Sequence, residues 1–248
     1  MPSKTNSRLH GASLLTIGLL ATGLVAPSVT ADDLSYTFLE VAGTYSDPNL
    51  PSAVRFNGDA ITRTDSSDGY GGSIRASLAL PEILPFIGFH VAGEYNLVNL
   101  DYSSVTTNGI LDGSFDSFSS DQTEWRLAAG VHANFADRIS AFAEVGYVES
   151  NFGDQAPLIE TSSGGFDARV GLRGMLTDKF EVNGFVRLNP NSALEVMDGN
   201  TLVSVVQDEG VTFNAGARYH LVGALSLVAD YEFGEDVSRL RAGLRLSF

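Results

Sequence analysis

The chain has 248 residues, no cysteine and a formal net charge of −15 at pH 7. This negative charge argues against nucleic-acid binding, because proteins that bind a phosphate backbone concentrate positive charge. Without cysteine no disulfide can form, so another kind of interaction must hold the fold together.

The first 31 residues have the pattern of a secretory signal peptide. Lys4 and Arg8 precede an apolar run over residues 12–27, and the small residues Val29 and Ala31 match a cleavage site. An uncleaved membrane anchor is the less favoured alternative, since the run is shorter than the roughly 20 residues that span a bilayer. We expect cleavage after Ala31, which leaves residues 32–248 as a single domain with a net charge of −17.

Ten segments of the remaining chain alternate between apolar and polar residues, which predicts ten β-strands. They lie near residues 34–45, 70–80, 86–99, 124–135, 138–149, 166–173, 179–189, 213–221, 225–233 and 238–248. The first segment is the weakest, because Glu40 falls on its apolar face unless a β-bulge shifts the register.

Short and long connections alternate between these segments. The short turns lie near residues 81–85, 136–137, 177–178 and 222–223, and the long acidic loops near 46–69, 100–122, 150–164 and 190–210. An even number of strands with short turns on one rim and long loops on the other is the layout of outer-membrane barrels. The predicted fold is all-β: a closed antiparallel transmembrane β-barrel of ten strands, with eight strands as the alternative.

A soluble β-sandwich would show the same alternation with its two faces exchanged. The strand lengths instead suit the roughly 9 to 11 residues that cross a bilayer at a tilt. Glycines recur on the polar face, as expected in a crowded lumen: Gly71, Gly130, Gly146, Gly171, Gly216 and Gly243. Aromatic residues on the apolar face fall at two levels, as in the girdles of membrane barrels: Tyr70, Tyr95, Trp125, Tyr147, Phe166 and Phe233 near the loops, and Phe89, Phe135, Phe180, Tyr219 and Phe248 near the turns.

The last segment, LRAGLRLSF at residues 240–248, resembles the C-terminal signal of bacterial outer-membrane proteins. With LSYTF at residues 34–38, it makes the chain similar to the small outer-membrane barrel families that include OmpA-like transmembrane domains, whose members commonly have eight strands. The resemblance is one of pattern and covers nearly the whole mature chain. It implies a place in the bacterial outer membrane among lipid and lipopolysaccharide, and insertion by the outer-membrane assembly machinery. Leu244, Leu246 and Phe248 would then be the recognised assembly signal, and no activity is implied.

The polar face carries nine arginines and seven carboxylates that should meet in the lumen. They are Arg75, Arg126, Arg169, Arg173, Arg187, Arg218, Arg239, Arg241 and Arg245, with Glu94, Glu124, Glu144, Asp167, Glu181, Asp230 and Glu232. A ten-stranded barrel is only slightly wider than one whose interior side chains fill completely. We therefore expect a lumen plugged by ion pairs, because an unpaired buried charge is costly. The alternative is a narrow channel with a charged selectivity filter.

An enzymatic reading finds little support in the histidines. His90, His132 and His220 should face the lumen near the turns, far from the acidic loops, so no Asp/His pair for activating water is apparent. Nucleotide-binding, metal-binding and nucleophile motifs are missing from the sequence. We expect no catalytic residue, cofactor or metal site, and a rim-located hydrolase is the least favoured function. The sequence predicts a non-enzymatic, monomeric barrel that acts in envelope structure or surface interaction through its long loops.

Overall fold

The structure is a computed structural model that describes residues 34–248, with gaps at 49–52, 57–58, 66–67, 82–85, 108–112, 137, 153–160, 190–191, 199–200, 208–209 and 235–236. The predicted signal peptide lies outside the described residues and stays a prediction. Within the described part of the chain, no helix is long and apolar enough to cross a membrane.

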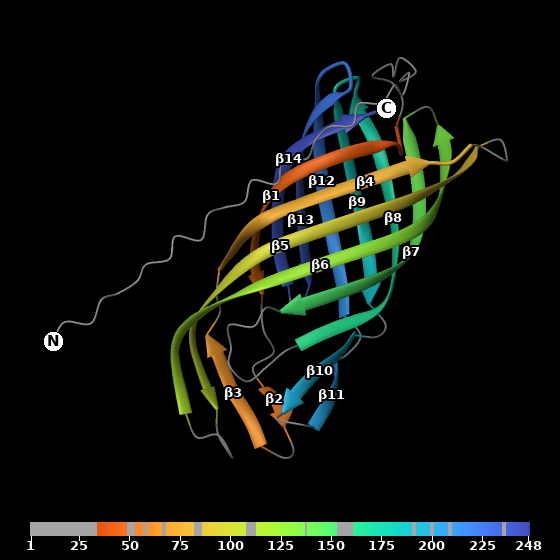
Figure 1. Cartoon of the computed structure of the whole chain (residues 1–248). Helices are drawn as coiled ribbons and strands as arrows, with labels where there is room; N and C mark the ends of the chain where they lie inside the picture. Colours follow the sequence, from red (N-terminus) through yellow and green to blue (C-terminus); the bar gives the residue numbers. More distant parts are fainter. Residues whose placement is uncertain are drawn as a thin grey trace, which may run out of the picture.

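Ten strands close into an antiparallel barrel (Figure 1). They are β1 (Phe38–Pro48), β4 (Gly69–Ala79), β5 (Ile87–Thr107), β6 (Gly113–Ala136), β7 (Ile139–Phe152), β8 (Thr161–Thr177), β9 (Phe180–Asn189), β12 (Gly210–Val222), β13 (Leu225–Gly234) and β14 (Val237–Ser247). Each strand pairs with its neighbours along the barrel, and β1 pairs with β14 from Phe38↔Ser247 to Pro48↔Val237, which forms a closing seam. The predicted ten-stranded barrel is confirmed, and the eight-stranded alternative is wrong.

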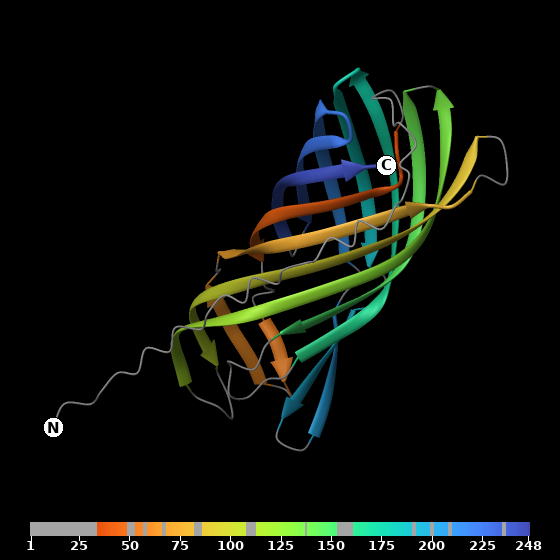
Figure 2. The ribbon, with the colours of Figure 1, turned by 45° about the horizontal axis from the view of Figure 1, so that its top comes forward.

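Four further strands extend the sheet beyond the loop-side rim: β2 (Ala53–Phe56), β3 (Asp59–Asp65), β10 (Ser192–Asp198) and β11 (Thr201–Gln207). β2 and β3 form a hairpin that joins the far end of β5, while β10 and β11 form a hairpin that joins β8. Figures 1 and 2 show both hairpins below the barrel. Residues 46–69 and 190–210, which were expected to be loops, therefore contain strands, and the extended ends of β5 and β6 occupy much of the predicted loop 100–122. The physical reason is that β5 and β8 continue past the barrel and offer unpaired edges to these segments.

The first strand also differs from the expectation. Its register with β4 and with β14 runs without a shift, so no bulge is present. Glu40 faces the lumen, where it is 1% exposed, and the aromatic side chains of Tyr36 and Phe38 face the same way. Glu40 was expected on the apolar face because the aromatic residues Tyr36 and Phe38 share its side of the strand, but that side faces the lumen.

The two faces of the barrel have the reverse polarity of a soluble protein. Leu127, Val145 and Val170 are about 60% exposed on the outside, while arginines and carboxylates are buried inside. A continuous apolar belt around a polar interior is stable in a bilayer rather than in water, which excludes the sandwich. The chain is a transmembrane β-barrel, and because this architecture is that of bacterial outer-membrane proteins, we assign it to the outer membrane.

Exposed aromatic rings mark both edges of the belt. Tyr70 and Phe166 lie toward the loops, and Phe135, Tyr219 and Phe248 lie toward the turns, all of them exposed. This arrangement agrees with the two predicted girdles, since aromatic rings prefer the interface between lipid and water.

Trp125, the single tryptophan, provides a test of this placement. Its ring centroid lies 5.5 Å from that of Tyr147 on the outer face of the loop-side girdle. In refolded vesicles, we expect its fluorescence to be quenched more by lipids brominated near the headgroup than by lipids brominated near the chain end. Strong quenching by aqueous acrylamide, with none by either lipid, would contradict the membrane orientation.

Candidate functional site

The candidate site is the lumen, because the buried charged side chains and histidines of the barrel lie there. The structure places all sixteen charged residues named from the sequence on the inner face. Each has an oppositely charged atom within 4.0 Å, and none of their side chains is more than 13% exposed. Strand alternation positions them, since every second residue of each strand points inward.

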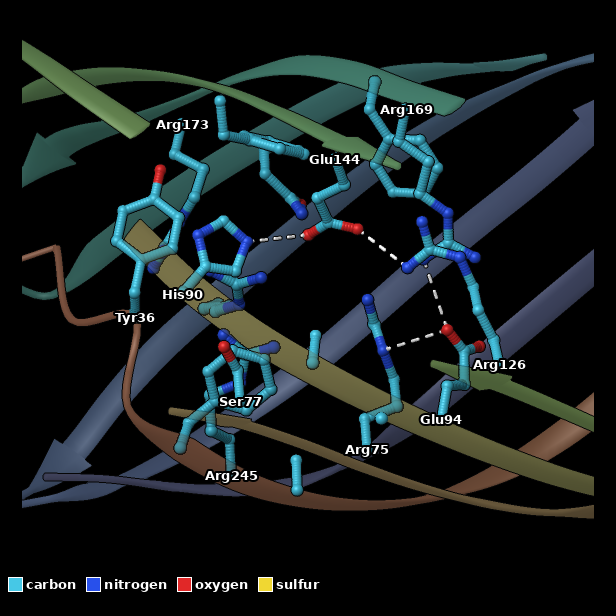
Figure 3. A pocket seen from close by; sticks show the side chains of 18 residues that line it. Tyr36, Arg75, Ser77, His90, Glu94, Arg126, Glu144, Arg169, Arg173 and Arg245 are labelled. Carbon is cyan, nitrogen blue, oxygen red and sulfur yellow. Dashed lines mark hydrogen bonds and ion pairs between the residues drawn. The ribbon is translucent and has the colours of Figure 1, made fainter. Parts of the chain in front are cut away.

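Glu94 on β5 is a centre of this network. One of its carboxylate oxygens lies 3.3 Å from Arg169 Nη1 and 3.7 Å from Arg75 Nε, and the other oxygen accepts a hydrogen bond from Arg241. The three arginines come from β8, β4 and β14, so Glu94 on β5 connects its neighbour β4 with two strands across the interior. Figure 3 shows Glu94 beside Arg75.

Asp167 on β8 is a second centre. Its Oδ2 lies 2.8 Å from Arg126 Nε and 2.7 Å from Arg187 Nε. Arg126 continues the chain of contacts, because its Nη1 donates to Glu144 at 2.8 Å, and Glu144 in turn lies 3.1 Å from His90 Nε2. Toward the loops, Arg239 pairs with Glu124 at 3.4 Å and Arg187 with Glu232 at 3.6 Å.

Two carboxylates, Glu40 and Glu181, accept hydrogen bonds from the arginines in the part of the lumen nearest the turns. Glu40 accepts from Arg245 Nε at 2.8 Å and from Arg75 Nη1 at 3.3 Å. Glu181 accepts from Arg173 Nε at 2.8 Å and also from Arg218. Sequence reasoning missed Glu40, although Ala42, Thr44 and Ser46 continue its face with small and polar residues. That pattern would have assigned Glu40 to the lumen.

The segment before β1 closes the turn-side end of the lumen. The Tyr36 ring stacks on His132 with 3.8 Å between centroids, and the Arg173 guanidinium lies 4.5 Å from the centre of the same ring. The Tyr36 hydroxyl lies 2.9 Å from Ser140 Oγ, and Arg173 Nη1 donates to the Ser35 carbonyl at 3.0 Å. Tyr36 therefore acts as a cap that side chains of three other strands hold in place.

The three histidines lie in the lumen near the turns. His90 and His132 are buried, with 3.4 Å between their Nδ1 atoms, and His220 Nδ1 lies 3.0 Å from Ser226 Oγ. Among the residues that the structure describes, no group of three His, Cys, Asp or Glu is arranged to hold a metal ion.

A cavity of about 50 Å³ remains between the charged side chains. The rings of Tyr36, Phe38, Phe142 and Phe185 form part of its wall, and arginines form much of the rest (Figure 3). This volume has room for a few water molecules, whereas a continuous water-filled path for a solute would need far more space.

No protein-family model and no curated protein matches the sequence. Among solved structures, the translocator domain of the autotransporter NalP from Neisseria meningitidis is 11% identical, with 86% of this chain and 88% of that chain covered and a TM-score of 0.42. The KdgM porin in complex with a disordered oligogalacturonate is 10% identical, with 85% and 99% covered and a TM-score of 0.40. The outer membrane protein OprG from Pseudomonas aeruginosa is 12% identical, with 88% and 98% covered and a TM-score of 0.38. Similarities of this size assign no family or activity, and the resemblance to OmpA-like domains stays a prediction.

Proposed function

We propose that this protein is a non-enzymatic outer-membrane barrel, whose lumen is a closed plug of ion pairs and whose loop side is a surface for structural or binding contacts. The observation that carries this proposal is the burial of the lumen charges. From Glu181 near the turns to Glu124 near the loops, their side chains are at most 13% exposed. Hydrated solutes would find no continuous path among side chains that contact one another so closely.

The arrangement of the pairs also favours a plug over a filter. A filter needs charges that face a water-filled path and exchange ions easily. Here the guanidinium groups instead contact carboxylates of other strands, as Arg126 does with Asp167 and Arg245 with Glu40. The Tyr36 cap adds an aromatic barrier at the turn side.

The loop side extends beyond the membrane and can therefore contact other molecules. β5 and β6 contain 21 and 24 residues, about twice what a bilayer crossing needs, so their far ends extend beyond the membrane. The hairpins β2–β3 and β10–β11 widen this extension. The lumen histidines lie at the opposite end within a closed interior, which supports a non-enzymatic role.

Electrophoresis and planar bilayers test the proposal together. We expect the refolded protein to shift in mobility on boiling and to give no stable current steps, while an open porin in the same bilayers gives them. As an internal control, deletion of residues 192–207 should keep the heat shift, because this hairpin pairs with the barrel only through the end of β8 among the described strands. Stable current steps from the full chain would overturn the plug.

One observation favours a second candidate, a narrow channel. Several buried polar atoms of the lumen have no partner among the described residues, including Thr44 Oγ1, Asn96 Oδ1, Asn214 Nδ2 and Arg239 Nε. Buried polar groups of this kind are normally satisfied by water. A hydrated lumen would lower the barrier for small ions, and the same conductance experiment separates the two functions.

A further inference from the structure

The turn-side group of lumen charges has more arginines than carboxylates. This group consists of Arg75, Arg173, Arg218 and Arg245 with Glu40 and Glu181. Arg75 and Arg245 share Glu40, and Arg173 and Arg218 share Glu181. Arg75 also lies 3.7 Å from Glu94 and 3.6 Å from Asp230, but the other three arginines have no second carboxylate within 4.0 Å among the described residues. Four guanidinium groups therefore depend mainly on two carboxylates.

The loop-side group of lumen charges compensates only part of this excess. It contains five arginines and six carboxylates: Arg126, Arg169, Arg187, Arg239 and Arg241, with Glu94, Glu124, Glu144, Asp167, Asp230 and Glu232. The described lumen thus holds nine arginines and eight carboxylates, which leaves one positive charge in excess. Arginine does not lose its proton in proteins, and a buried charge without a counter-ion is costly.

The excess positive charge faces the cavity of about 50 Å³ described above. All four arginines of the turn-side group line the cavity, whereas their carboxylates Glu40 and Glu181 do not. Arg126 and Arg169 also line it, and the only carboxylates on the described wall are Glu94 and Glu144. The cavity is therefore surrounded by six guanidinium groups and two carboxylates, which makes it a region of positive potential.

Unused hydrogen-bond donors line the same wall. Arg218 Nε, Arg126 Nη2 and Arg169 Nε are buried and have no hydrogen-bond partner among the described residues, and the same is true of Ser77 Oγ. Their side chains all contribute to the cavity, and the four residues are between 2% and 7% exposed. Each unpartnered donor costs free energy unless an acceptor lies within reach.

We propose that this cavity is a binding site for a small monovalent anion such as chloride or formate. One negative charge would neutralise the lumen, and its acceptor positions would satisfy the free N–H and O–H donors of the wall. The cavity volume of about 50 Å³ suits a small ion and excludes an anion as large as gluconate. This site goes beyond the proposed function, because it makes the anion a structural part of the closed lumen.

The test measures heat-modifiable mobility at constant ionic strength in different sodium salts. We expect the midpoint of unfolding to rise by several degrees when chloride or formate replaces gluconate, and the rise to saturate with concentration, as for a specific ligand. Arg218→Gln removes one guanidinium group and its free N–H donor from the cavity wall, so its midpoint should no longer depend on the anion. Arg239→Gln is the matched control, because it removes the same single charge from the lumen but leaves the cavity wall intact. Arg239 is not among the residues that line the cavity, so the midpoint of this variant should keep its dependence on the anion.

Two outcomes would overturn the site. One is a wild-type midpoint that is the same in every salt. The other is an equal response in the wild type and both variants, which would indicate general screening.

If Arg218→Gln does not refold, crystals of the wild type grown in bromide test the site directly. An anomalous peak within hydrogen-bond distance of Arg218 Nε supports the site, and a cavity without a peak refutes it. Current steps in planar bilayers would refute the plug but not the anion site, so the two proposals fail separately.

Discussion

Glu94→Ala is expected to lower the free energy of unfolding by about 3 kcal/mol, the lower end of the range for breaking a buried ion pair. The substitution leaves Arg75, Arg169 and Arg241 without their shared carboxylate in an interior that water hardly reaches. Each arginine keeps another carboxylate within 4.0 Å, which places the loss at that lower end. Urea unfolding in vesicles, followed by Trp125 fluorescence, measures the effect.

The exposed pair of Arg138 and Asp178 supplies the control. Their side chains are 52% and 71% exposed at the turn-side rim, so Asp178→Asn should change the free energy of unfolding by less than about 1 kcal/mol. Glu94→Gln keeps the shape of the side chain and removes its charge, and should still be strongly destabilised. A Glu94→Gln protein as stable as the wild type would show that the lumen charges contribute little to the fold.

Gly243→Ala is expected to weaken the closing seam by about 1 to 3 kcal/mol, the usual cost of forcing an extra carbon into a packed site. A Cβ at this position would lie 2.1 Å from the Val41 carbonyl oxygen and 2.5 Å from Ala42 Cα. Both are backbone atoms of β1 that cannot rotate away, so the two strands would have to separate. The yield of heat-modifiable protein and the urea midpoint should both fall.

Gly43→Ala is the matched control in the same seam. Ala42 pairs with Gly243 and Gly43 pairs with Ala242, so the two glycines occupy adjacent positions on opposite strands. A Cβ on Gly43 would find its nearest neighbour, the Ala242 carbonyl oxygen, at 3.9 Å, which is an ordinary contact. If both variants lost the same yield and the same urea midpoint, the close approach of β1 to Gly243 would not control the closure of the barrel.

The barrel itself could be predicted from the sequence because alternation is a local property. In β14, the inward arginines at 239, 241 and 245 and the outward leucines at 240, 244 and 246 follow directly from a period of two. Glycines on the polar face were equally informative, since an added Cβ at Gly71, Gly216 or Gly243 would lie within about 2 Å of a neighbouring atom.

The sequence pattern could not predict which arginine pairs with which carboxylate in the lumen. Glu94 contacts Arg241, which is 147 residues away, and the choice among nine arginines depends on barrel tilt and side-chain length. Glu40 was misjudged because Tyr36 and Phe38 resemble a lipid-facing pair, while their actual partners, His132 and Arg245, lie on other strands. The hairpins at residues 53–65 and 192–207 depend on the far ends of β5 and β8, which short-range patterns do not describe.

The closing seam joins the first and the last strand of the described chain, with Phe38 opposite Ser247. Contacts between residues so distant in sequence raise the contact order, and chains of high contact order fold slowly. Until β14 meets β1, two strand edges carry unpaired N–H and C=O groups, each of which costs several kcal/mol in hydrocarbon. An open intermediate is therefore unstable within the bilayer, and insertion and closure should be coupled in one cooperative step.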